Sequence, residues 1–237
     1  MAKGPRIVVL TGSGVSAESG LSTFRDKDGI WAKYDYRQVA TPEGFAADPA
    51  LVHDFYNQRR RLLKGIAPNA AHVALAELEA GLSAAGGALL VVTQNVDNLH
   101  EKAGSANVLH MHGELAKARC GLCEEAGEWP GDLSIDIECP FCGVKGAMRP
   151  DVVWFGETPK YLDEIAGALA RADQFVSIGT SGAVYPAAGF VRDARALCIP
   201  CTELNLEPSD NAGAFTERRY GKASEIVPQW AREFLAE

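Results

Sequence analysis

Short apolar segments rich in β-branched residues alternate along this chain with amphipathic helical segments, and this alternation restricts the fold more than any other feature. Short runs without regular polar alternation are typical of strands buried on both faces of a sheet. The expected strands cover 7–11, 89–93, 108–111, 152–154, 175–178 and 202–206, and the expected helices cover 50–64, 70–80, 161–172, 186–197 and 228–235. This order predicts an α/β fold with a parallel sheet that helices cover on both faces.

The stretch 115–149 interrupts this alternation, because it is rich in Gly, Cys and Glu and has no long apolar run. It carries two Cys-x-x-Cys pairs with fifteen residues between them. Four thiolates at this spacing suit a closed tetrahedral zinc site, so we expect a structural metal in a small inserted module. Zinc would replace the hydrophobic core that so short a module cannot build. The expected ligands are Cys120, Cys123, Cys139 and Cys142.

Cys198 and Cys201 form a third pair of the same spacing, for which a redox dithiol is the alternative to ordinary thiols. Redox pairs lie at a helix N-terminus, which lowers the thiol pKa. This pair instead follows an expected helix and enters an expected strand. We therefore expect ordinary buried or loop thiols.

A glycine-rich turn, Gly12-Ser13-Gly14-Val15-Ser16-Ala17, directly follows the first expected strand and fits the G-x-G-x-x-G/A dinucleotide pattern. Its glycines allow a pyrophosphate to approach the backbone closely, at a helix start with partial positive charge. A tight turn without a ligand is the alternative. The polar segment 24–29 stands where a dehydrogenase would continue its helix, which favours a long loop over the cofactor instead of hydride transfer.

Polar residues also follow two other expected strands, at 93–97 and at His112-Gly113. In open α/β sheets this edge binds ligands. An amide and a carboxylate there can orient a ribose and a water, and a histidine can accept a hydroxyl proton. His110 and His112 share one face of the strand, so the sequence pattern does not choose between them. The remaining histidines, which we expect to be satisfied polar residues, are His53, His72 and His100.

Tyr56 and Arg59 lie three residues apart on one face of an expected helix. Together they can present a hydroxyl and a planar guanidinium to a carboxylate. The alternative is a solvated helix face that includes Arg60 and Arg61.

The formal net charge of −8 argues against electrostatically driven nucleic-acid binding, and so against a zinc-ribbon nucleic-acid module. No apolar run approaches the roughly 20 residues that a membrane-spanning helix needs. The N-terminal residues leave no room for a secretion leader before the first expected strand. We expect a cytoplasmic protein without a membrane span.

Taken together, these motifs resemble the sirtuin family. Segments 179–181 and 205–207 extend a likeness that covers nearly the entire chain, in order and at family spacing, and is nearest to the compact bacterial class. Ser13 departs from the family, which usually has alanine there. The segments that carry the likeness are 12–16, Ser19-Gly20, Phe24-Arg25, 93–97, His112-Gly113 and the two zinc pairs.

The resemblance implies one sirtuin-type catalytic domain over 1–237, in which NAD and acyl-lysine meet between a large and a small part. We expect it to act as a monomer. The implied division is a Rossmann-type part at 1–25, 85–114 and 150–237, a cofactor loop and helical part of the small domain at 26–84, and a zinc-binding module at 115–149.

The resemblance also implies residue roles: His112 as the general base, with Asn95 and Asp97 at the nicotinamide ribose. Segment 153–157 would take up the substrate peptide as an extra strand. The implied substrate residues are Ala40, Tyr56, Arg59, Val153, Trp154, Phe155 and Gly156. The implied NAD residues are Gly12, Ser13, Gly14, Ser16, Ala17, Thr23, Phe24, Arg25, Trp31, Gln94, Asn95, Val96, Asp97, Gly179, Thr180, Ser181, Asn205, Leu206, Glu207 and Ala223.

The implied reaction removes acyl groups from protein lysines and consumes NAD, giving nicotinamide, 2'-O-acyl-ADP-ribose and free lysine, while one zinc ion stays structural. Tyr56 and Arg59 match the pair that marks sirtuins acting on succinyl- and malonyl-lysine, and Ala40 lies where that class keeps its acyl pocket roomy. We therefore expect desuccinylation together with deacetylation. The alternatives are ADP-ribosyl transfer to protein and a non-catalytic reader of NAD or acyl-lysine.

Overall fold

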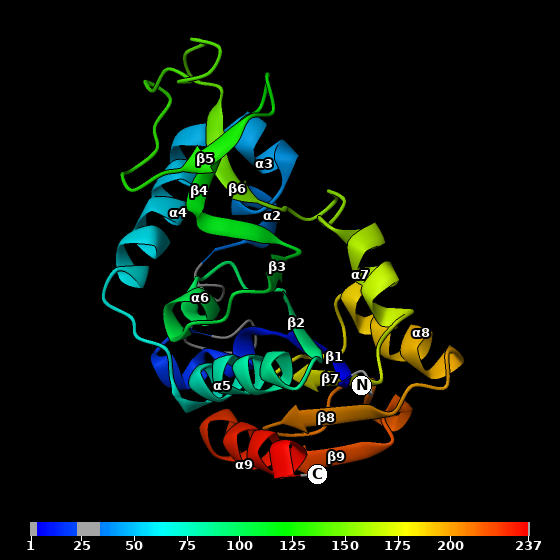
Figure 1. Cartoon of the computed structure of the whole chain (residues 1–237). Helices are drawn as coiled ribbons and strands as arrows, with labels where there is room; N and C mark the ends of the chain where they lie inside the picture. The colour runs from blue at the N-terminus through cyan, green and yellow to red at the C-terminus, as the bar shows by residue number, and fades with distance from the viewer. Residues whose placement is uncertain (1–3, 23–33, 237) are drawn as a thin grey trace.

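A computed structural model describes residues 4–22 and 34–236 of the chain. Its centre is a six-stranded parallel sheet of order β3-β2-β1-β7-β8-β9 (Figure 1). This order is the one found in dinucleotide-binding Rossmann sheets, and it confirms the α/β prediction. The strands are β1 (Arg6–Thr11), β2 (Ala88–Thr93), β3 (Val108–His110), β7 (Gln174–Ile178), β8 (Cys201–Asn205) and β9 (Glu217–Tyr220).

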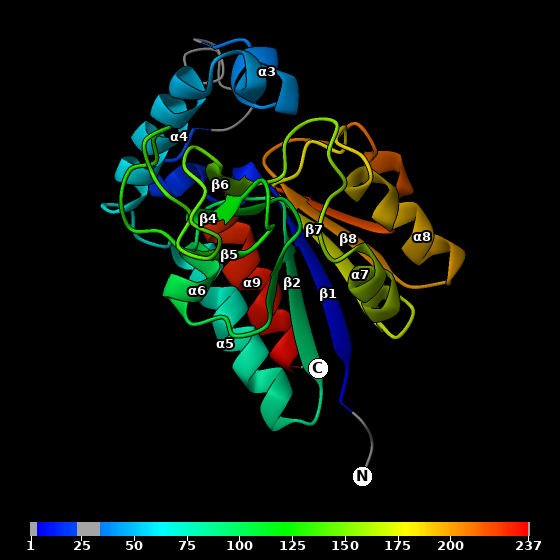
Figure 2. The same ribbon diagram turned by 90° about the horizontal axis from the view of Figure 1, so that it is seen from above.

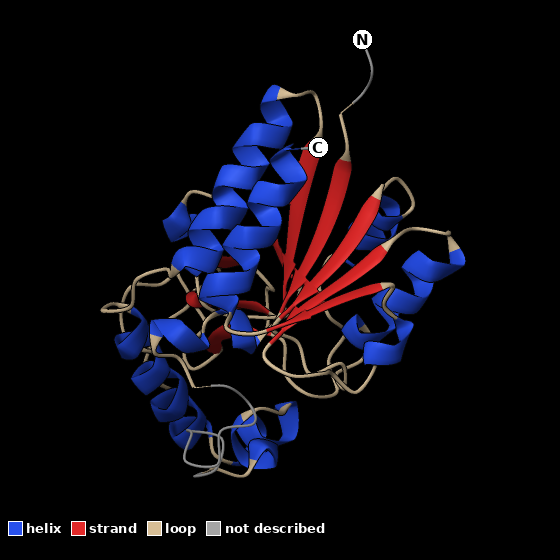
Figure 3. Cartoon of the chain, turned by 90° about the horizontal axis from the view of Figure 1, so that it is seen from below, coloured by secondary structure: helices blue, strands red, loops and turns tan. Residues whose placement is uncertain are grey.

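Helices cover both faces of this sheet, as Figure 3 shows. On one face, Val9 of the central strand packs in a cluster with the helices α5 (Ala70–Ala84) and α9 (Ala223–Ala236). On the other, Val8 packs in a cluster with α7 (Leu162–Leu169) and α8 (Phe190–Ala196). Because successive side chains of a strand point to opposite faces, one unbroken apolar run supplies both cores.

A second, antiparallel sheet of order β5-β4-β6 lies beyond the carboxyl ends of the parallel strands (Figures 1 and 2). Its strands are β4 (Gly113–Cys120), β5 (Ala126–Glu128) and β6 (Met148–Val152). The helices α2 (Tyr36–Val39), α3 (Pro42–Ala47) and α4 (Pro49–Leu63) pack beside it, and α6 (Leu99–Ala103) follows β2. Strands β4 and β6 run across the expected module borders at 115 and 149.

One expectation about strands was wrong, and one strand of the parallel sheet was missed. The apolar residues 152–154 do not form a strand of the parallel sheet, because residues 148–152 pair antiparallel with β4. A short buried run carries no information about which sheet it joins. Strand β9 was not predicted, because its sequence Glu-Arg-Arg-Tyr is charged and mostly exposed, as is common for edge strands.

Helix α9 begins at Ala223, earlier than the expected start at Pro228. Among the described residues, no helix is both long and apolar enough to cross a membrane.

Candidate active site

The chain reverses its direction of winding between β1 and β7, which are neighbours at the centre of the sheet. From β1 it crosses to β2 on one side, and from β7 it crosses to β8 on the other. Ligands of open α/β proteins bind outside the carboxyl ends of the strands at such a point. The segments 12–17 and 179–181 leave β1 and β7 there, 94–97 leaves β2, and 205–207 closes β8. The sheet thus gathers the described cofactor candidates of these segments at one edge.

The two loops at this point pack backbone against backbone. The Gly12 N–H donates to the Ile178 carbonyl at 3.0 Å, and the Gly14 N–H donates to the Gly179 carbonyl at 2.9 Å. A Cβ at Gly14 would lie 2.8 Å from the Gly179 Cα, and one at Gly179 would lie 2.4 Å from the Val15 nitrogen. Gly179 also has a φ of +62°, which favours glycine. The glycine pattern is therefore required by this loop contact, apart from any ligand.

Three buried polar side chains converge beside the glycine turn. The Ser16 hydroxyl donates to Asp97 Oδ2 at 3.1 Å, and Asn95 Nδ2 donates to the Ser16 Oγ at 3.2 Å and the Gly12 carbonyl at 3.1 Å. Asp97 Oδ1 accepts from the Leu99 N–H at 3.1 Å. Burial raises the pKa of Asp97, because a charged carboxylate is poorly solvated there. The turn and the strand-end segment 94–97 thus form one rigid polar wall.

The two histidines that the sequence could not separate have different surroundings. His110 is 5% exposed and uses both ring nitrogens: Nδ1 faces the Asn95 carbonyl at 3.2 Å and Nε2 faces Glu101 Oε1 at 2.6 Å. Both partners are acceptors, so the ring can donate to both of them only as an imidazolium. Burial opposes this charge, but the hydrogen bond and charge of Glu101 outweigh it and raise the pKa of His110. Because acceptors engage both of its ring nitrogens, His110 is poorly placed to act as a base.

His112 is half-buried, and its Nδ1 donates to the Gln94 carbonyl at 3.2 Å. That bond leaves the lone pair on Nε2, which has no hydrogen-bond partner within residues 4–22 and 34–236. Burial lowers the pKa of His112, although the bond to Gln94 works in the opposite direction. A neutral imidazole with an unengaged Nε2 is what a general base requires.

His72 and His100 form a buried pair behind the polar wall, with ring centroids 4.9 Å apart. His72 Nε2 lies 3.4 Å from the Ser16 Oγ, and His100 Nε2 lies 3.0 Å from the Thr11 Oγ1. Burial lowers their pKa values to about 4 and about 3, so both rings are neutral. His53 differs from the expected satisfied residue, because neither of its buried ring nitrogens has a hydrogen-bond partner in the described part of the chain, and His100 Nδ1 has none there either.

Tyr56 and Arg59 lie on α4, and Tyr56 packs in the core that joins the helices to the antiparallel sheet. Tyr56 is 1% exposed and accepts a hydrogen bond from Trp154 Nε1 at 3.0 Å. Burial raises its pKa to about 12, so the hydroxyl stays protonated. The half-buried Arg59 places its Cζ 5.8 Å from the centroid of the Tyr56 ring. The guanidinium of Arg59 therefore lies beside the buried Tyr56 ring.

The alternative of a solvated arginine face on α4 does not hold. Arg60 is 4% exposed and donates to the Leu115 carbonyl at 2.9 Å and to Asn57 Oδ1 at 2.9 Å. Arg61 is exposed and pairs with Asp132. Three successive arginines thus have three different environments.

Segment 153–156 connects the candidate NAD residues near His112 with the candidate substrate residues near Ala40. The Val153 N–H donates to the carbonyl of His112 at 2.8 Å, and the Phe155 N–H donates to the carbonyl of Ala40 at 2.9 Å. The Leu115 N–H donates to the Val96 carbonyl at 2.8 Å. The segment expected to bind a peptide therefore lies directly against the expected base.

The four cysteines form one cluster at the far end of β4, with all Sγ atoms within 4.8 Å of one another. Cys120 and Cys142 place their sulfurs 3.8 Å apart, and Cys123 and Cys139 place theirs 3.7 Å apart. A tetrahedron with zinc–sulfur bonds of about 2.3 Å has edges of about 3.8 Å, so the thiolates fit a zinc ion.

The Leu122 and Phe141 N–H groups lie 3.4 Å from the sulfurs of Cys120 and Cys139. The eight-residue strand β4 separates Cys120 from the glycine that follows His112. Such a strand is on the order of 25 Å long, so the metal would lie far from that histidine.

The comparisons with known proteins agree with this geometry. The model of the Sir2 family matches residues 12–186, which is most of the chain. The chain belongs to the Sir2 family. A relative from Caulobacter vibrioides, named NAD-dependent protein deacylase, is 61% identical over 233 residues, which cover 98% of this chain and 97% of the relative.

Solved Sir2 structures align over nearly the full length. A Sir2 homologue in complex with NAD has a TM-score of 0.87 and 38% identity, covering 98% of this chain and 91% of its own. A Sir2 protein with a deacetylated p53 peptide and 3'-O-acetyl-ADP-ribose has a TM-score of 0.81 and 29% identity, covering 98% and 94%.

Several residues around the sheet edge of this Sir2 chain had no sequence signal. Glu203 is 1% exposed and accepts hydrogen bonds from the Ser209 N–H at 3.2 Å and from the Tyr220 hydroxyl at 2.9 Å. It thereby holds the loop that follows Asn205, whose Nδ2 donates to the Thr180 carbonyl at 2.8 Å. In the sequence, the only indication of this role is a glutamate within an otherwise apolar expected strand.

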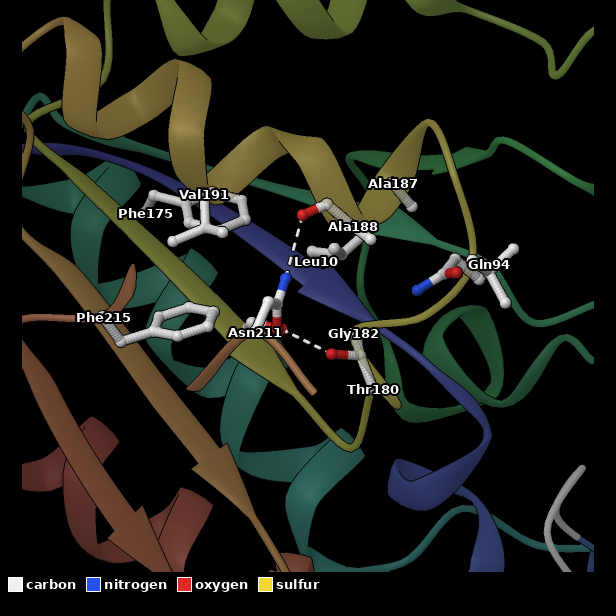
Figure 4. Close-up of a pocket in the computed structure, with 12 residues that line it drawn as sticks. Leu10, Gln94, Phe175, Thr180, Gly182, Ala187, Ala188, Val191, Asn211 and Phe215 are labelled. Atoms are coloured by element: carbon white, nitrogen blue, oxygen red, sulfur yellow. Dashed lines mark hydrogen bonds between the residues drawn. The ribbon is translucent and has the colours of Figure 1, made fainter. Parts of the chain in front are cut away.

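A pocket under the same edge is lined by Leu10, Gln94, Thr180 and Asn211, among others (Figure 4). Asn211 Nδ2 donates to the Ala188 carbonyl at 2.9 Å, and the Thr180 Oγ1 lies 2.8 Å from the Ser177 Oγ. Gln94 thus reaches into a small space that these bonds keep rigid.

The third cysteine pair has the environment of ordinary thiols. Cys201 is buried, Cys198 is exposed, and burial raises the pKa of Cys201 to about 11. A raised pKa disfavours the thiolate that redox chemistry needs. Four of the expected NAD residues, Thr23, Phe24, Arg25 and Trp31, lie outside the described residues.

Proposed function

We propose that this chain is an NAD-dependent protein deacylase, which removes acyl groups from lysines and yields nicotinamide, 2'-O-acyl-ADP-ribose and free lysine. The observation that carries this proposal is the environment of His112. Its free Nε2 lies at the ligand-binding edge of the sheet, while its carbonyl accepts from the peptide-binding segment through Val153. The deacylase name of the relatives and the NAD complex of a solved homologue support the same function.

NAD, when bound, supplies an anomeric carbon that the acyl oxygen of the substrate can attack as nicotinamide leaves. The chain's own residues bind and orient. We assign Asn95 and Asp97 to hold the nicotinamide ribose, because hydrogen bonds to Ser16 orient both side chains at this edge of the sheet. His112 takes a proton from a ribose hydroxyl at Nε2, and its Nδ1–H stays on the Gln94 carbonyl. The full proposed NAD set is Gly12, Ser13, Gly14, Ser16, Ala17, Thr23, Phe24, Arg25, Trp31, Gln94, Asn95, Val96, Asp97, Gly179, Thr180, Ser181, Asn205, Leu206, Glu207 and Ala223.

For the acyl group we propose succinyl- and malonyl-lysine together with acetyl-lysine. A guanidinium beside a protonated tyrosine hydroxyl suits a carboxylate at the end of the acyl chain. Ala40, which is 3% exposed and packs in the same core as Tyr56, adds little bulk beside them. We assign the acyl-lysine peptide to Ala40, Tyr56, Arg59, Val153, Trp154, Phe155 and Gly156.

We assign one structural zinc ion to Cys120, Cys123, Cys139 and Cys142. The four thiolates leave no open coordination position, and the strand β4 separates them from His112. Zinc-binding thiolates persist in reducing compartments. We therefore also propose a cytoplasmic protein. As a separate proposal, it acts as a monomer.

Incubation of matched acetyl- and succinyl-lysine peptides with and without NAD tests the function, with His112→Tyr as the inactive control. We expect loss of the acyl mass only with NAD and only with His112 intact. A gain of ADP-ribose on the protein would favour ADP-ribosyl transfer. Binding without any loss of acyl mass would favour a non-catalytic reader.

A further inference from the structure

The Tyr56 hydroxyl is a buried polar group whose hydrogen-bonding capacity is only half used. Its partner is Trp154 Nε1 at 3.0 Å. An indole N–H can only donate, so the phenolic oxygen of Tyr56 is the acceptor of this bond. The hydroxyl hydrogen must therefore point away from Trp154, and within residues 4–22 and 34–236 no acceptor lies in hydrogen-bond range of it. Buried polar atoms have at least one hydrogen-bond partner, and Tyr56 meets this through its acceptor function alone, so its O–H donor is available to a ligand.

The charged neighbour of Tyr56 cannot supply the missing acceptor. Arg59 lies with its Cζ 5.8 Å from the Tyr56 ring centroid, and a guanidinium has donors only. The remaining ring contacts of Tyr56 are to Phe55 at 5.0 Å and Trp154 at 6.4 Å. A ligand oxygen can accept the Tyr56 O–H, and a negative charge on the same ligand suits the neighbouring Arg59 guanidinium, whereas an acetyl methyl group offers neither.

Trp154 itself is held on two sides by one ion pair. The Arg149 guanidinium lies 3.4 Å from the centroid of the indole ring. The same guanidinium donates to both carboxylate oxygens of Glu157, at 2.6 and 3.0 Å, and Glu157 accepts from the Trp154 backbone N–H at 2.8 Å. The indole is 2% exposed, so the direction of its N–H is fixed.

We propose that Trp154 is a positioning residue for acyl selectivity: by donating to the Tyr56 oxygen, it directs the Tyr56 O–H toward a carboxylate at the end of the acyl chain. This inference rests on the proposed deacylase function. It adds Trp154, which lies outside α4, to the residues that determine the acyl preference. Removal of the indole N–H in Trp154→Phe leaves an aromatic ring under Arg149. It should lower the succinyl-to-acetyl ratio of kcat/KM about threefold to tenfold, the range of one net hydrogen bond.

A double-mutant cycle tests whether Trp154 acts through the hydroxyl. The ratio is measured at saturating NAD for the wild type, Trp154→Phe, Tyr56→Phe and the double variant. We expect Trp154→Phe to lower it in the presence of Tyr56 and to have no further effect in the Tyr56→Phe background. Trp129→Phe is the matched control, because Trp129 donates through Nε1 to the Asp132 carbonyl in the zinc module, and it should leave the ratio unchanged.

Calorimetric binding of the two peptides without NAD gives a second readout, in which Trp154→Phe should weaken succinyl-lysine binding more than acetyl-lysine binding. Should Trp154→Phe fail to fold, 3-benzothienylalanine at the same position replaces the N–H by sulfur and keeps the ring shape.

An equal fall of kcat/KM for both peptides in Trp154→Phe would overturn the inference in favour of plain ring packing. The same fall of the succinyl-to-acetyl ratio in the Tyr56→Phe background would do so as well. A wild type that removes acetyl but neither removes nor binds succinyl would overturn it as well, while leaving deacylation intact. Failure of the proposed function looks different, because the wild type would then remove neither group with NAD, and the calorimetric comparison would still decide the role of Trp154.

Discussion

Replacement of Arg59 by methionine should separate the two acyl activities. The substitution keeps a long side chain but removes the guanidinium that would pair with the succinyl carboxylate. Loss of one partner of a buried, hydrogen-bonded charge pair costs about 2 to 5 kcal/mol. Because Arg59 is only half-buried, solvent screening favours the lower part of this range, about 2 to 3 kcal/mol. That corresponds to a fall of roughly 30-fold to 150-fold in kcat/KM for succinyl-lysine.

Acetyl-lysine ends in a methyl group and has no charge to pair, so its kcat/KM should change by less than about threefold. Initial rates on matched peptides at saturating NAD measure both values. Arg61→Met is the matched control, because it removes the same charge from the exposed side of the helix, where Arg61 pairs with Asp132. Equal loss of both activities in Arg59→Met would refute the carboxylate-reading role.

Three further predictions follow from the site. Chelation of zinc, or Cys142→Ser, should unfold the zinc module and lower both deacylase activities together. Added zinc should restore the activity of the chelated protein. Full activity of a protein that metal analysis shows to be free of zinc would contradict this prediction. Because burial lowers the pKa of His112, the acid limb of the kcat/KM profile should have its midpoint below pH 6.5, and a midpoint above that value would argue against this base. Glu203→Gln weakens the hydrogen bonds to Ser209 and Tyr220. The KM for NAD should therefore rise about threefold to tenfold at unchanged kcat. An unchanged KM would contradict the role of Glu203 in holding the loop.

Features encoded by neighbouring residues were predictable. The zinc ligands follow from local spacing, since two Cys-x-x-Cys pairs define four ligands, and their sulfurs do cluster. The glycine turn was predictable too, because Gly12 and Gly14 directly follow a buried strand. The parallel sheet followed from alternating strands and helices, although the charged edge strand β9 had no apolar pattern to reveal it.

Features that depend on distant contacts were not predictable from the residues alone. His110 and His112 occupy equivalent positions in the pattern, and only the contacts to Glu101 and to the Gln94 carbonyl distinguish them. The bond between Tyr56 and Trp154 joins residues 98 positions apart. No local spacing contains such a pair, whereas burial and hydrogen-bond direction in the folded chain define it.

The most direct test of the proposed reaction is a mass-spectrometric balance of its small-molecule products. The wild-type protein is incubated with a succinyl-lysine peptide and NAD, and nicotinamide, succinyl-ADP-ribose and free-lysine peptide are quantified together. Transfer of the acyl group to ADP-ribose predicts the three products in equal amounts, and none of them with His112→Tyr. Free succinate formed without consumption of NAD, or ADP-ribose attached to protein while the peptide stays acylated, would contradict the proposed function.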